Sequence, residues 1–268
     1  MATRAAPGEP AAVAGRSVAT FRFYEELNDL LRAELRKRAF DYAFIGSPAV
    51  KDAIEAIGVP HTEVDLVLID GESVGFGRHL RDGNRVAVYP AFERLDIASL
   101  TRLRPRPLRR SRFVLDVHLG TLARYLRLLG FDTLYRNDYD DAEIVRVAHD
   151  QGRIVLTRDR GLLKHRAVTR GRWIRSTQPS AQLRETLAAF DLAGNLRPFT
   201  RCAVCNGSLL RIDPRLAARL VPARVRERHS DFARCASCRR VYWPGTHIAR
   251  IRAALRASAV DLPPAVRR

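Results

Sequence analysis

The sequence predicts an α/β protein made of three folded units: a β-rich unit with one main helix, an α/β unit with a mostly parallel sheet, and a small four-cysteine unit. Three observations support this prediction. Strand-like alternation surrounds a helical pattern in residues 17–97, strand and helix patterns alternate in residues 112–191, and all four cysteines lie in the last quarter of the chain. A length of 268 residues is enough for two or three compact domains.

The first unit, residues 17–97, has the pattern of a β-grasp, the ubiquitin-like architecture, because several strands enclose one clear helix. Strands are expected at Ser17–Tyr24, Phe40–Ile45, Val64–Ile69 and Arg85–Tyr89. Apolar residues repeat at helical spacing in Val50–Ile57, a second helical stretch is expected near Glu26–Arg36, and Asp70-Gly71 is typical of a hairpin turn.

The same unit is similar to the sulfur-carrier proteins of thiamine and molybdopterin synthesis over Val50–Val59, Val64–Gly71 and Asp82–Pro90. Those carriers act through a C-terminal Gly-Gly, whereas this chain has Pro90-Ala91-Phe92 at that point and continues. Sulfur transfer is therefore disfavoured. We expect a binding or positioning module that contacts a protein partner.

Two segments around this unit are expected to lack a fold of their own. Residues 1–16 are rich in Ala, Pro and Gly without a continuous apolar run, which indicates a disordered leader and not a secretory signal. Residues 98–111 are rich in Pro and Arg and indicate a linker, whose arginines either contact phosphates or stay solvated. No apolar run approaches the ~18–20 residues that cross a membrane, so we expect a cytoplasmic protein without a membrane partner.

Residues 112–195 are expected to form an α/β domain with a mostly parallel sheet, because short apolar runs alternate with amphipathic helical patterns. Buried strands are expected at Phe113–Val117, Asp132–Tyr135, Ile154–Thr157 and Trp173–Ile174. Helices are expected at Leu119–Leu129, Ala142–Gln151 and Ser180–Phe190.

Acidic residues gather where these elements end or begin. Asp116 ends the first strand, Asp159 follows the third, and Asp141 opens a helix. Because functional groups collect at the carboxyl ends of parallel strands, this arrangement predicts a site for Mg²⁺ or Mn²⁺, which prefer oxygen ligands. The competing interpretation is helix capping, which applies above all to the neighbouring acids Asp138, Asp140 and Glu143.

The cysteines form two close pairs, Cys202-x-x-Cys205 and Cys235-x-x-Cys238, with residues 206–234 between them. Two pairs at this spacing predict a closed, structural Zn²⁺ site in a ribbon over residues 196–250, in preference to a disulfide or a redox pair. Nearby, Tyr242 and Trp243 either pack in a core or stack on bases, and His247 is expected to pack or to contact RNA. A basic tail, residues 251–268, follows; Arg250, Arg252 and Arg256 either bind RNA or stay solvated.

The net charge of +18 comes from 47 basic residues against 29 acidic ones, and only three of the basic residues are lysines. Codon bias explains arginine in place of lysine but does not explain the excess of basic residues. A surface this basic attracts polyanions, although a solvated face remains the alternative. The residues expected to hold RNA near the acidic site are Arg124, Arg127, Arg158, Arg160 and Lys164.

The α/β unit closely resembles the mut-seven C-terminal RNase domain family, which is classed with PIN-like nucleases. The resemblance rests on Phe113-Val-Leu-Asp116, on Leu119-Gly-Thr-Leu-Ala-Arg-Tyr-Leu-Arg-Leu-Leu-Gly-Phe-Asp132 and on Ile154-Val-Leu-Thr-Arg-Asp159, and it extends into the zinc segment and the first unit. It implies a PIN-like three-layer domain and a metal-dependent ribonuclease in which Asp116, Asp141 and Asp159 bind Mg²⁺ or Mn²⁺. Asp138, Asp140 and Glu143 compete as a fourth member.

The resemblance further implies in-line attack by water, which leaves a 5′-phosphate and a 3′-hydroxyl on an RNA such as tRNA or rRNA. A second hypothesis belongs to a different class: a non-catalytic adaptor that binds RNA or the ribosome. The charge excess and the two accessory units support the adaptor, and the presence of all three core acids favours the enzyme.

Overall fold

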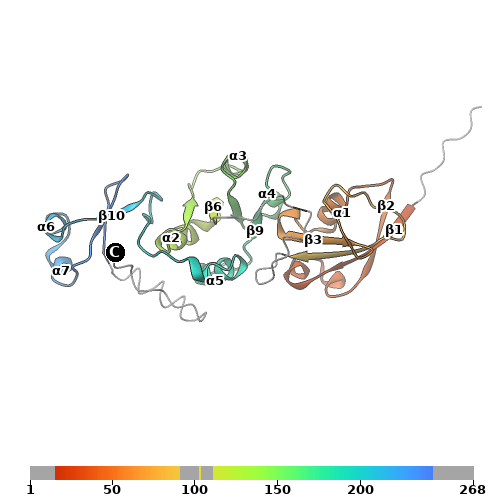
Figure 1. Cartoon of the computed structure of the whole chain (residues 1–268), viewed down its shortest axis with the longest axis horizontal. Helices are drawn as coiled ribbons and strands as arrows, with labels where there is room; N and C mark the ends of the chain where they lie inside the picture. Colours follow the sequence, from red (N-terminus) through yellow and green to blue (C-terminus); the bar gives the residue numbers. More distant parts are fainter. Residues whose placement is uncertain (1–15, 91–102, 104–110, 244–268) are drawn as a thin grey trace, which may run out of the picture. The chain divides into compact units, whose positions relative to one another are not determined.

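The computed structural model describes residues 16–90, 103 and 111–243, which divide into two compact units (Figure 1). Residues 16–59 and 64–90 belong to the first unit, and residues 60–63 and 111–243 to the second. The expected leader, nearly all of the expected linker, His247 and the basic tail lie outside the described residues. None of the described helices has the length and hydropathy needed to cross a membrane.

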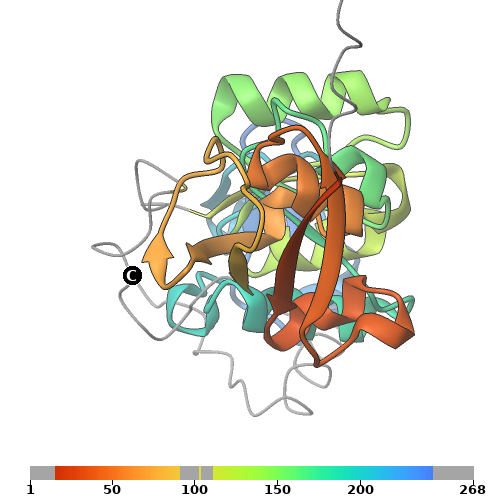
Figure 2. The ribbon, with the colours of Figure 1, turned by 90° about the vertical axis from the view of Figure 1, so that its right-hand side faces the viewer.

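The first unit is built on a five-stranded sheet with the order β2-β1-β5-β3-β4. The two central strands β1 and β5 run parallel, and their other neighbours are antiparallel. Figure 2 views this unit with β1 and β2 in red to orange. The strands are β1 (Arg16–Phe23), β2 (Phe40–Ile45), β3 (Val64–Ile69), β4 (Glu72–Ser73) and β5 (Arg85–Pro90), with helix α1 (Val50–Ile57). The predicted β-grasp arrangement is confirmed.

One element of this unit differs from its prediction. The segment expected to be helical near Glu26–Arg36 forms two short 3-10 helices, Glu25–Leu30 and Ala33–Leu35. The buried Asn28 side chain donates to the carbonyl oxygens of Phe23 (3.1 Å) and Glu25 (2.9 Å) and accepts from the Lys37 amide (2.6 Å). Such side-chain bonds to the backbone compete with the α-helical ladder.

The second unit contains a four-stranded sheet with the order β7-β6-β8-β9, and all three strand pairs are parallel. Its strands are β6 (Arg112–Leu115), β7 (Asp132–Leu134), β8 (Ile154–Thr157) and β9 (Gly171–Trp173). Its helices are α2 (Gly120–Leu128), α3 (Asp141–Gln151), α4 (Arg160–Leu163) and α5 (Pro179–Ala189). The mostly parallel α/β sheet expected from the sequence is therefore confirmed.

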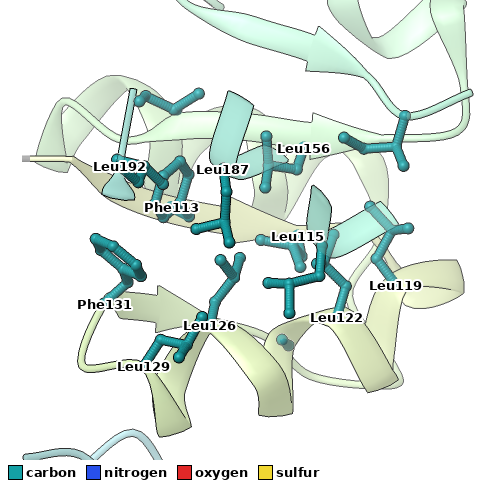
Figure 3. Packing of buried hydrophobic residues seen from close by; sticks show 14 of the residues in the cluster. Phe113, Leu115, Leu119, Leu122, Leu126, Leu129, Phe131, Leu156, Leu187 and Leu192 are labelled. Carbon is teal, nitrogen blue, oxygen red and sulfur yellow. The ribbon is translucent and has the colours of Figure 1, made fainter. Parts of the chain in front are cut away.

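Alternating side chains of the central strands divide the core into two layers, as the pleat of a strand requires. Leu115 on β6 and Leu156 on β8 pack with α2 and α5, and Figure 3 shows Leu126 of α2 and Leu187 of α5 on this side. On the other face, the intervening Val114 and Val155 pack with α3 and α4. The result is a helix–sheet–helix arrangement of three layers.

A smaller antiparallel sheet follows, with the order β10-β11-β12. Its strands are β10 (Leu209–Arg211), β11 (Ala233–Cys235) and β12 (Val241–Tyr242), and two one-turn helices, α6 (Pro214–Ala217) and α7 (Ala223–Arg226), lie between β10 and β11. Ala217, Val221 and Phe232 form its small core. So few apolar side chains bury little area, and small domains of this kind usually need a metal or a disulfide.

Candidate functional site

Asp116 lies directly after β6, one of the two inner strands of the parallel sheet, and is 5% exposed. Its Oδ1 accepts a hydrogen bond from the His118 amide (2.8 Å), and its Oδ2 accepts from the Arg158 amide (2.8 Å) and from the Thr157 hydroxyl. Two amides and a hydroxyl therefore stabilise this carboxylate and fix its orientation.

Thr157, the last residue of β8, connects Asp116 to the second predicted acid. The pairing of Leu115 with Leu156 places Asp116 beside Thr157 at the carboxyl edge of the sheet. Thr157 is fully buried, and its hydroxyl donates to Asp116 and accepts from the Asp159 amide (2.8 Å). Asp159 itself is exposed, and its Oδ1 accepts from the Gly161 amide (2.7 Å) at the start of α4. A hydroxyl residue two positions before an acid was the only hint of this link in the sequence.

The four acids near the start of α3 differ in their contacts. Asp140 is the N-cap, because its Oδ1 accepts from the Glu143 amide (2.7 Å). Asp138 and Glu143 both pair with Arg136, at 2.8 and 3.4 Å. The hydrogen bond from Arg136 also lowers the pKa of Asp138. Asp141 opens α3, and its exposed carboxylate makes no hydrogen bond or ion pair with the described residues. Capping and pairing thus account for the other three acids but not for Asp141.

The acidic residues described at this edge, unlike the cysteines, do not form a compact group of metal ligands. Among the residues that the structure describes, the four cysteines are the only group of three or more His, Cys, Asp or Glu side chains placed to hold one metal ion, and their sulfurs all lie within 4.8 Å of one another. Asp116, Asp141 and Asp159 therefore do not form a closed three-carboxylate cage. Mg²⁺ usually keeps several waters and takes only one or two carboxylates in proteins, so it does not require such a cage.

The four cysteine sulfurs have the spacing of a tetrahedral metal site. Cys202 Sγ lies 3.6 Å from Cys238 Sγ, and Cys205 Sγ lies 3.4 Å from Cys235 Sγ. A Zn–S bond of ~2.3 Å places tetrahedral sulfurs roughly 3.8 Å apart, whereas a disulfide bond is only ~2.05 Å long. All four are free thiols, so the donor set fits zinc and excludes the disulfide alternative in this structure.

The protein backbone arranges each pair as a knuckle. The Cys205 amide donates to Cys202 Sγ (3.5 Å), and the Cys238 amide donates to Cys235 Sγ (3.4 Å). The knuckles are packed closely beside Gly207, where a Cβ would lie 2.6 Å from Ser237 Oγ and 3.1 Å from Cys235 Sγ. A side chain at residue 207 would therefore displace the Ser237 side chain or the Cys235 sulfur.

The thiols have shifted acidities. Burial raises the pKa of Cys202, but hydrogen bonds from the Tyr242 hydroxyl and from backbone amides outweigh it and lower this pKa to about 6. At Cys238 the Arg240 amide lowers the pKa, whereas burial and the neighbouring thiols raise it to about 12. Thiolates packed this closely repel one another, and a bound dication would offset that repulsion.

The five basic residues expected at an RNA surface are placed differently. Arg124 and Arg160 are exposed, and the Arg160 guanidinium lies 5.2 Å from the centre of the Trp173 ring. Arg158 is half-buried and donates to the Ser176 carbonyl oxygen (2.6 Å), and Lys164 is half-buried as well. Arg124 lies on α2 and Arg160 opens α4, which pack in different core layers, so the RNA-binding role of these four residues stays a prediction.

Arg127 does not belong to the expected RNA surface. It is 3% exposed and donates to the carbonyl oxygens of Thr133, Tyr135, Ala203 and Val204. A phosphate cannot reach a guanidinium that is buried and bonded in this way. Burial lowers the pKa of Arg127, and the nearby Cys202 and Cys205 act in the opposite direction. The structure thus corrects the RNA-binding role predicted for Arg127 to a structural one.

The aromatic pair after the second knuckle also has structural contacts. The Tyr242 hydroxyl lies 2.9 Å from Cys202 Sγ, and the partly buried Trp243 packs against the core of the small sheet. The structure therefore supports core packing for Trp243 and a hydrogen bond to a cysteine sulfur for Tyr242.

Comparisons with known families agree with this description. A model described as Mut7-C ubiquitin matches residues 16–96, and a model described as Mut7-C RNAse domain matches residues 111–255. The search among curated proteins gave no match, and neither did the search among solved structures. The second match spans more than half of the 268 residues and includes both the acidic sheet edge and the four cysteines. The chain therefore belongs to the Mut7-C RNAse domain family, and it carries the Mut7-C ubiquitin domain before the RNAse domain.

Proposed function

We propose that the protein is a metal-dependent ribonuclease whose reaction centre is the carboxyl edge of the parallel sheet. One observation supports this above all: Asp116 is a buried carboxylate, oriented by two amides and by the Thr157 hydroxyl, which also accepts from the amide of the exposed Asp159. A buried acid with fixed oxygen atoms is a suitable ligand for a hard cation. Membership of an RNAse family makes RNA the expected substrate.

In this proposal each acid has a defined role. Asp116 and Asp159 would hold Mg²⁺ or Mn²⁺, and Asp141 would contribute from the start of α3. When bound, such a cation supplies an activated water and stabilises the leaving oxygen of the phosphodiester. Arg124, Arg158, Arg160 and Lys164 would hold the RNA backbone against this edge. Water attacks the phosphorus in line with the leaving 3′-oxygen, so the expected products are a 5′-phosphate and a 3′-hydroxyl.

The test is cleavage of end-labelled RNA by the zinc-loaded full chain with Mg²⁺ or Mn²⁺. Asp116→Asn and Asp159→Asn should each abolish cleavage, because each replacement removes a charged ligand and keeps the size of the side chain. Asp150→Asn is a matched control, since Asp150 lies at the far end of α3 and is exposed. Circular dichroism and RNA binding of all variants should resemble the unmodified protein.

The outcomes separate the two candidate functions. Cleavage that needs the metal and disappears in both site variants supports the nuclease. Cleavage that survives in both variants would remove these residues from the site. A protein that binds RNA in a salt-sensitive way but never cleaves it would be an RNA- or ribosome-binding adaptor.

One observation favours the adaptor: the acidic residues described at this edge do not form a compact ligand cluster, whereas the cysteines do. Divalent-metal affinity discriminates between the candidates. A nuclease should bind Mn²⁺ at a site that Asp116→Asn weakens, and an adaptor should bind no metal beyond the tightly held zinc. The ubiquitin-like unit would bind a protein partner under either function.

A further inference from the structure

The first cysteine knuckle lies against β7, the outer strand of the parallel sheet. β7 pairs with β6 on one side only, so the outward-pointing backbone groups of Thr133 need other partners. The side chain of Asn206, the residue after Cys205, accepts from the Thr133 amide (3.1 Å). Arg127 Nε donates to the Thr133 carbonyl oxygen (2.8 Å). The amide and the carbonyl of this edge are therefore both satisfied by side chains.

Arg127 connects the same edge to the knuckle. Its Nη1 donates to the carbonyl oxygens of Ala203 (3.2 Å) and Val204 (2.8 Å), which lie between the two cysteines of the first pair. The guanidinium is a planar group with five donors, and a lysine ammonium cannot reproduce its geometry. One buried side chain of α2 therefore holds the turn that carries two of the four sulfurs.

Charge supports the same coupling. One dication and four thiolates sum to a net double negative charge. The buried guanidinium of Arg127 touches the carbonyls of the knuckle, and a buried cation is costly unless an opposite charge or hydrogen bonds offset it. A loaded site therefore favours the buried position of Arg127, and the position of Arg127 in turn favours the loaded site.

The contacts continue from β7 towards Asp116. Tyr135 follows β7, and its hydroxyl donates to the carbonyl oxygen of Val117 (3.2 Å), the residue after Asp116. Its ring occupies the space beside Gly120, where a Cβ would lie 2.6 Å from the Tyr135 hydroxyl. Arg127 Nη2 also donates to the Tyr135 carbonyl oxygen (3.4 Å). A change at the knuckle can thus reach the segment that carries the buried acid.

We propose that Arg127 and Asn206 are positioning residues that couple metal binding at the four cysteines to the order of β7 and of the adjoining Tyr135. Loss of the metal loosens this edge of the RNAse domain before the rest of the sheet. The coupling is independent of whether the domain cleaves RNA, because it concerns only the stability of one strand.

The test is hydrogen–deuterium exchange of the full chain, zinc-loaded and after chelation, with metal release verified by elemental analysis. Exchange in a peptide covering residues 131–137 should rise on chelation by a factor of about 5–150, the usual range of coupling between two sites. A peptide covering α5, residues 179–189, should change little. Unchanged exchange in residues 131–137, or an equal rise in both peptides, would overturn the proposal.

Two variants test the assigned residues. Asn206 has a φ of 65°, so Asn206→Gly keeps this backbone conformation and removes only the side chain. Because coupling is reciprocal, zinc affinity in competition with a chromogenic chelator should fall about tenfold, and exchange of residues 131–137 should depend less on zinc. Arg127→Lys keeps the positive charge but loses the planar set of guanidinium donors. It should also lower zinc affinity and make exchange of residues 131–137 less dependent on zinc.

Asn195→Gly is the matched control, because Asn195 is exposed and lies in a 3-10 helix (Ala193–Asn195) that contains none of the four cysteines. It should bind zinc and exchange as the unmodified protein does. If Arg127→Lys fails to fold, Asn206→Gly alone decides. Unaltered zinc affinity and unaltered zinc dependence of exchange in Asn206→Gly would refute the coupling.

Discussion

At the scale of single residues, Thr157 is the side chain that links the two strand-end acids. Its buried hydroxyl bonds to Asp116 and to the Asp159 amide. Thr157→Val keeps the shape of the side chain but leaves both partners without their hydroxyl contact. We expect the free energy of unfolding to fall by about 1–3 kcal/mol. Urea denaturation would measure this, and Thr157→Ser, which restores the hydroxyl, should lie close to the unmodified protein; equal losses in both variants would contradict this role.

Asp132 gives a second prediction at this scale, concerning pH. Burial raises its pKa, but hydrogen bonds from Arg153 and Asn206, with the charges of Arg153 and Arg201, outweigh burial and lower it. A carboxyl group whose pKa is lower in the folded state stabilises the fold above its unfolded pKa of ~3.9 and loses this contribution as pH falls through the folded pKa.

Asp132→Asn should therefore reduce the free energy of unfolding by about 1–3 kcal/mol near neutral pH, since a charged group loses its hydrogen bonds. The difference from the unmodified protein should shrink below a pH of about 4. Urea denaturation across this pH range checks the sign. A difference that stays constant down to the lowest pH would show that the carboxylate charge is not its cause.

At the scale of elements, Gly130 decides how α2 ends. It has a φ of 97°, and a Cβ there would lie 2.2 Å from the backbone oxygen of Arg197. Gly130→Ala should lower the free energy of unfolding by at least about 1–2 kcal/mol, because a side chain is strained in this conformation and meets backbone atoms. Gly194→Ala is the control, since nothing lies within 4 Å of its Cβ position. Thermal unfolding of both variants tests this, and a similar melting temperature for the two would contradict it.

At the scale of the whole molecule, the net charge of +18 predicts RNA binding that weakens steeply with salt. The logarithm of the binding constant should fall linearly with the logarithm of salt concentration, because each phosphate contact releases counterions. Arg124 and Arg127 both lie on α2, but only Arg124 is exposed and can contact a phosphate. Arg124→Gln should reduce the magnitude of the salt slope by about one, whereas Asn195→Gly should leave it unchanged. Fluorescence anisotropy with labelled RNA measures both slopes, and an unchanged slope in Arg124→Gln would remove this residue from the RNA surface.

Much of this organisation follows from local sequence patterns. The strands and the three longer helices of the α/β unit were predictable to within a few residues, because buried strands are short apolar runs and helices repeat with their own period, whereas the one-turn helix α4 was not predicted. The four-cysteine group that could hold a metal was predictable for a related reason: the Cys-x-x-Cys spacing brings two sulfurs together within one turn, whatever the rest of the fold does. The parallel sheet then implied that Asp116 and Asp159 share one edge.

Only the tertiary structure decided the roles that depend on distant segments. Helical periodicity placed Arg127 off the apolar stripe of its helix and therefore indicated a solvent-facing residue, but the knuckle of residues 202–205 covers it. Side-chain geometry likewise decides the roles of the acids near α3. Asp140 caps the helix, Asp138 and Glu143 pair with Arg136, and Asp141 does neither. Sequence alone determined most of the elements and the pairing of the cysteines because short-range spacing specifies them. It could not assign Arg127 because the burial of a charged side chain depends on which carbonyls the folded chain brings to it from far away in the sequence.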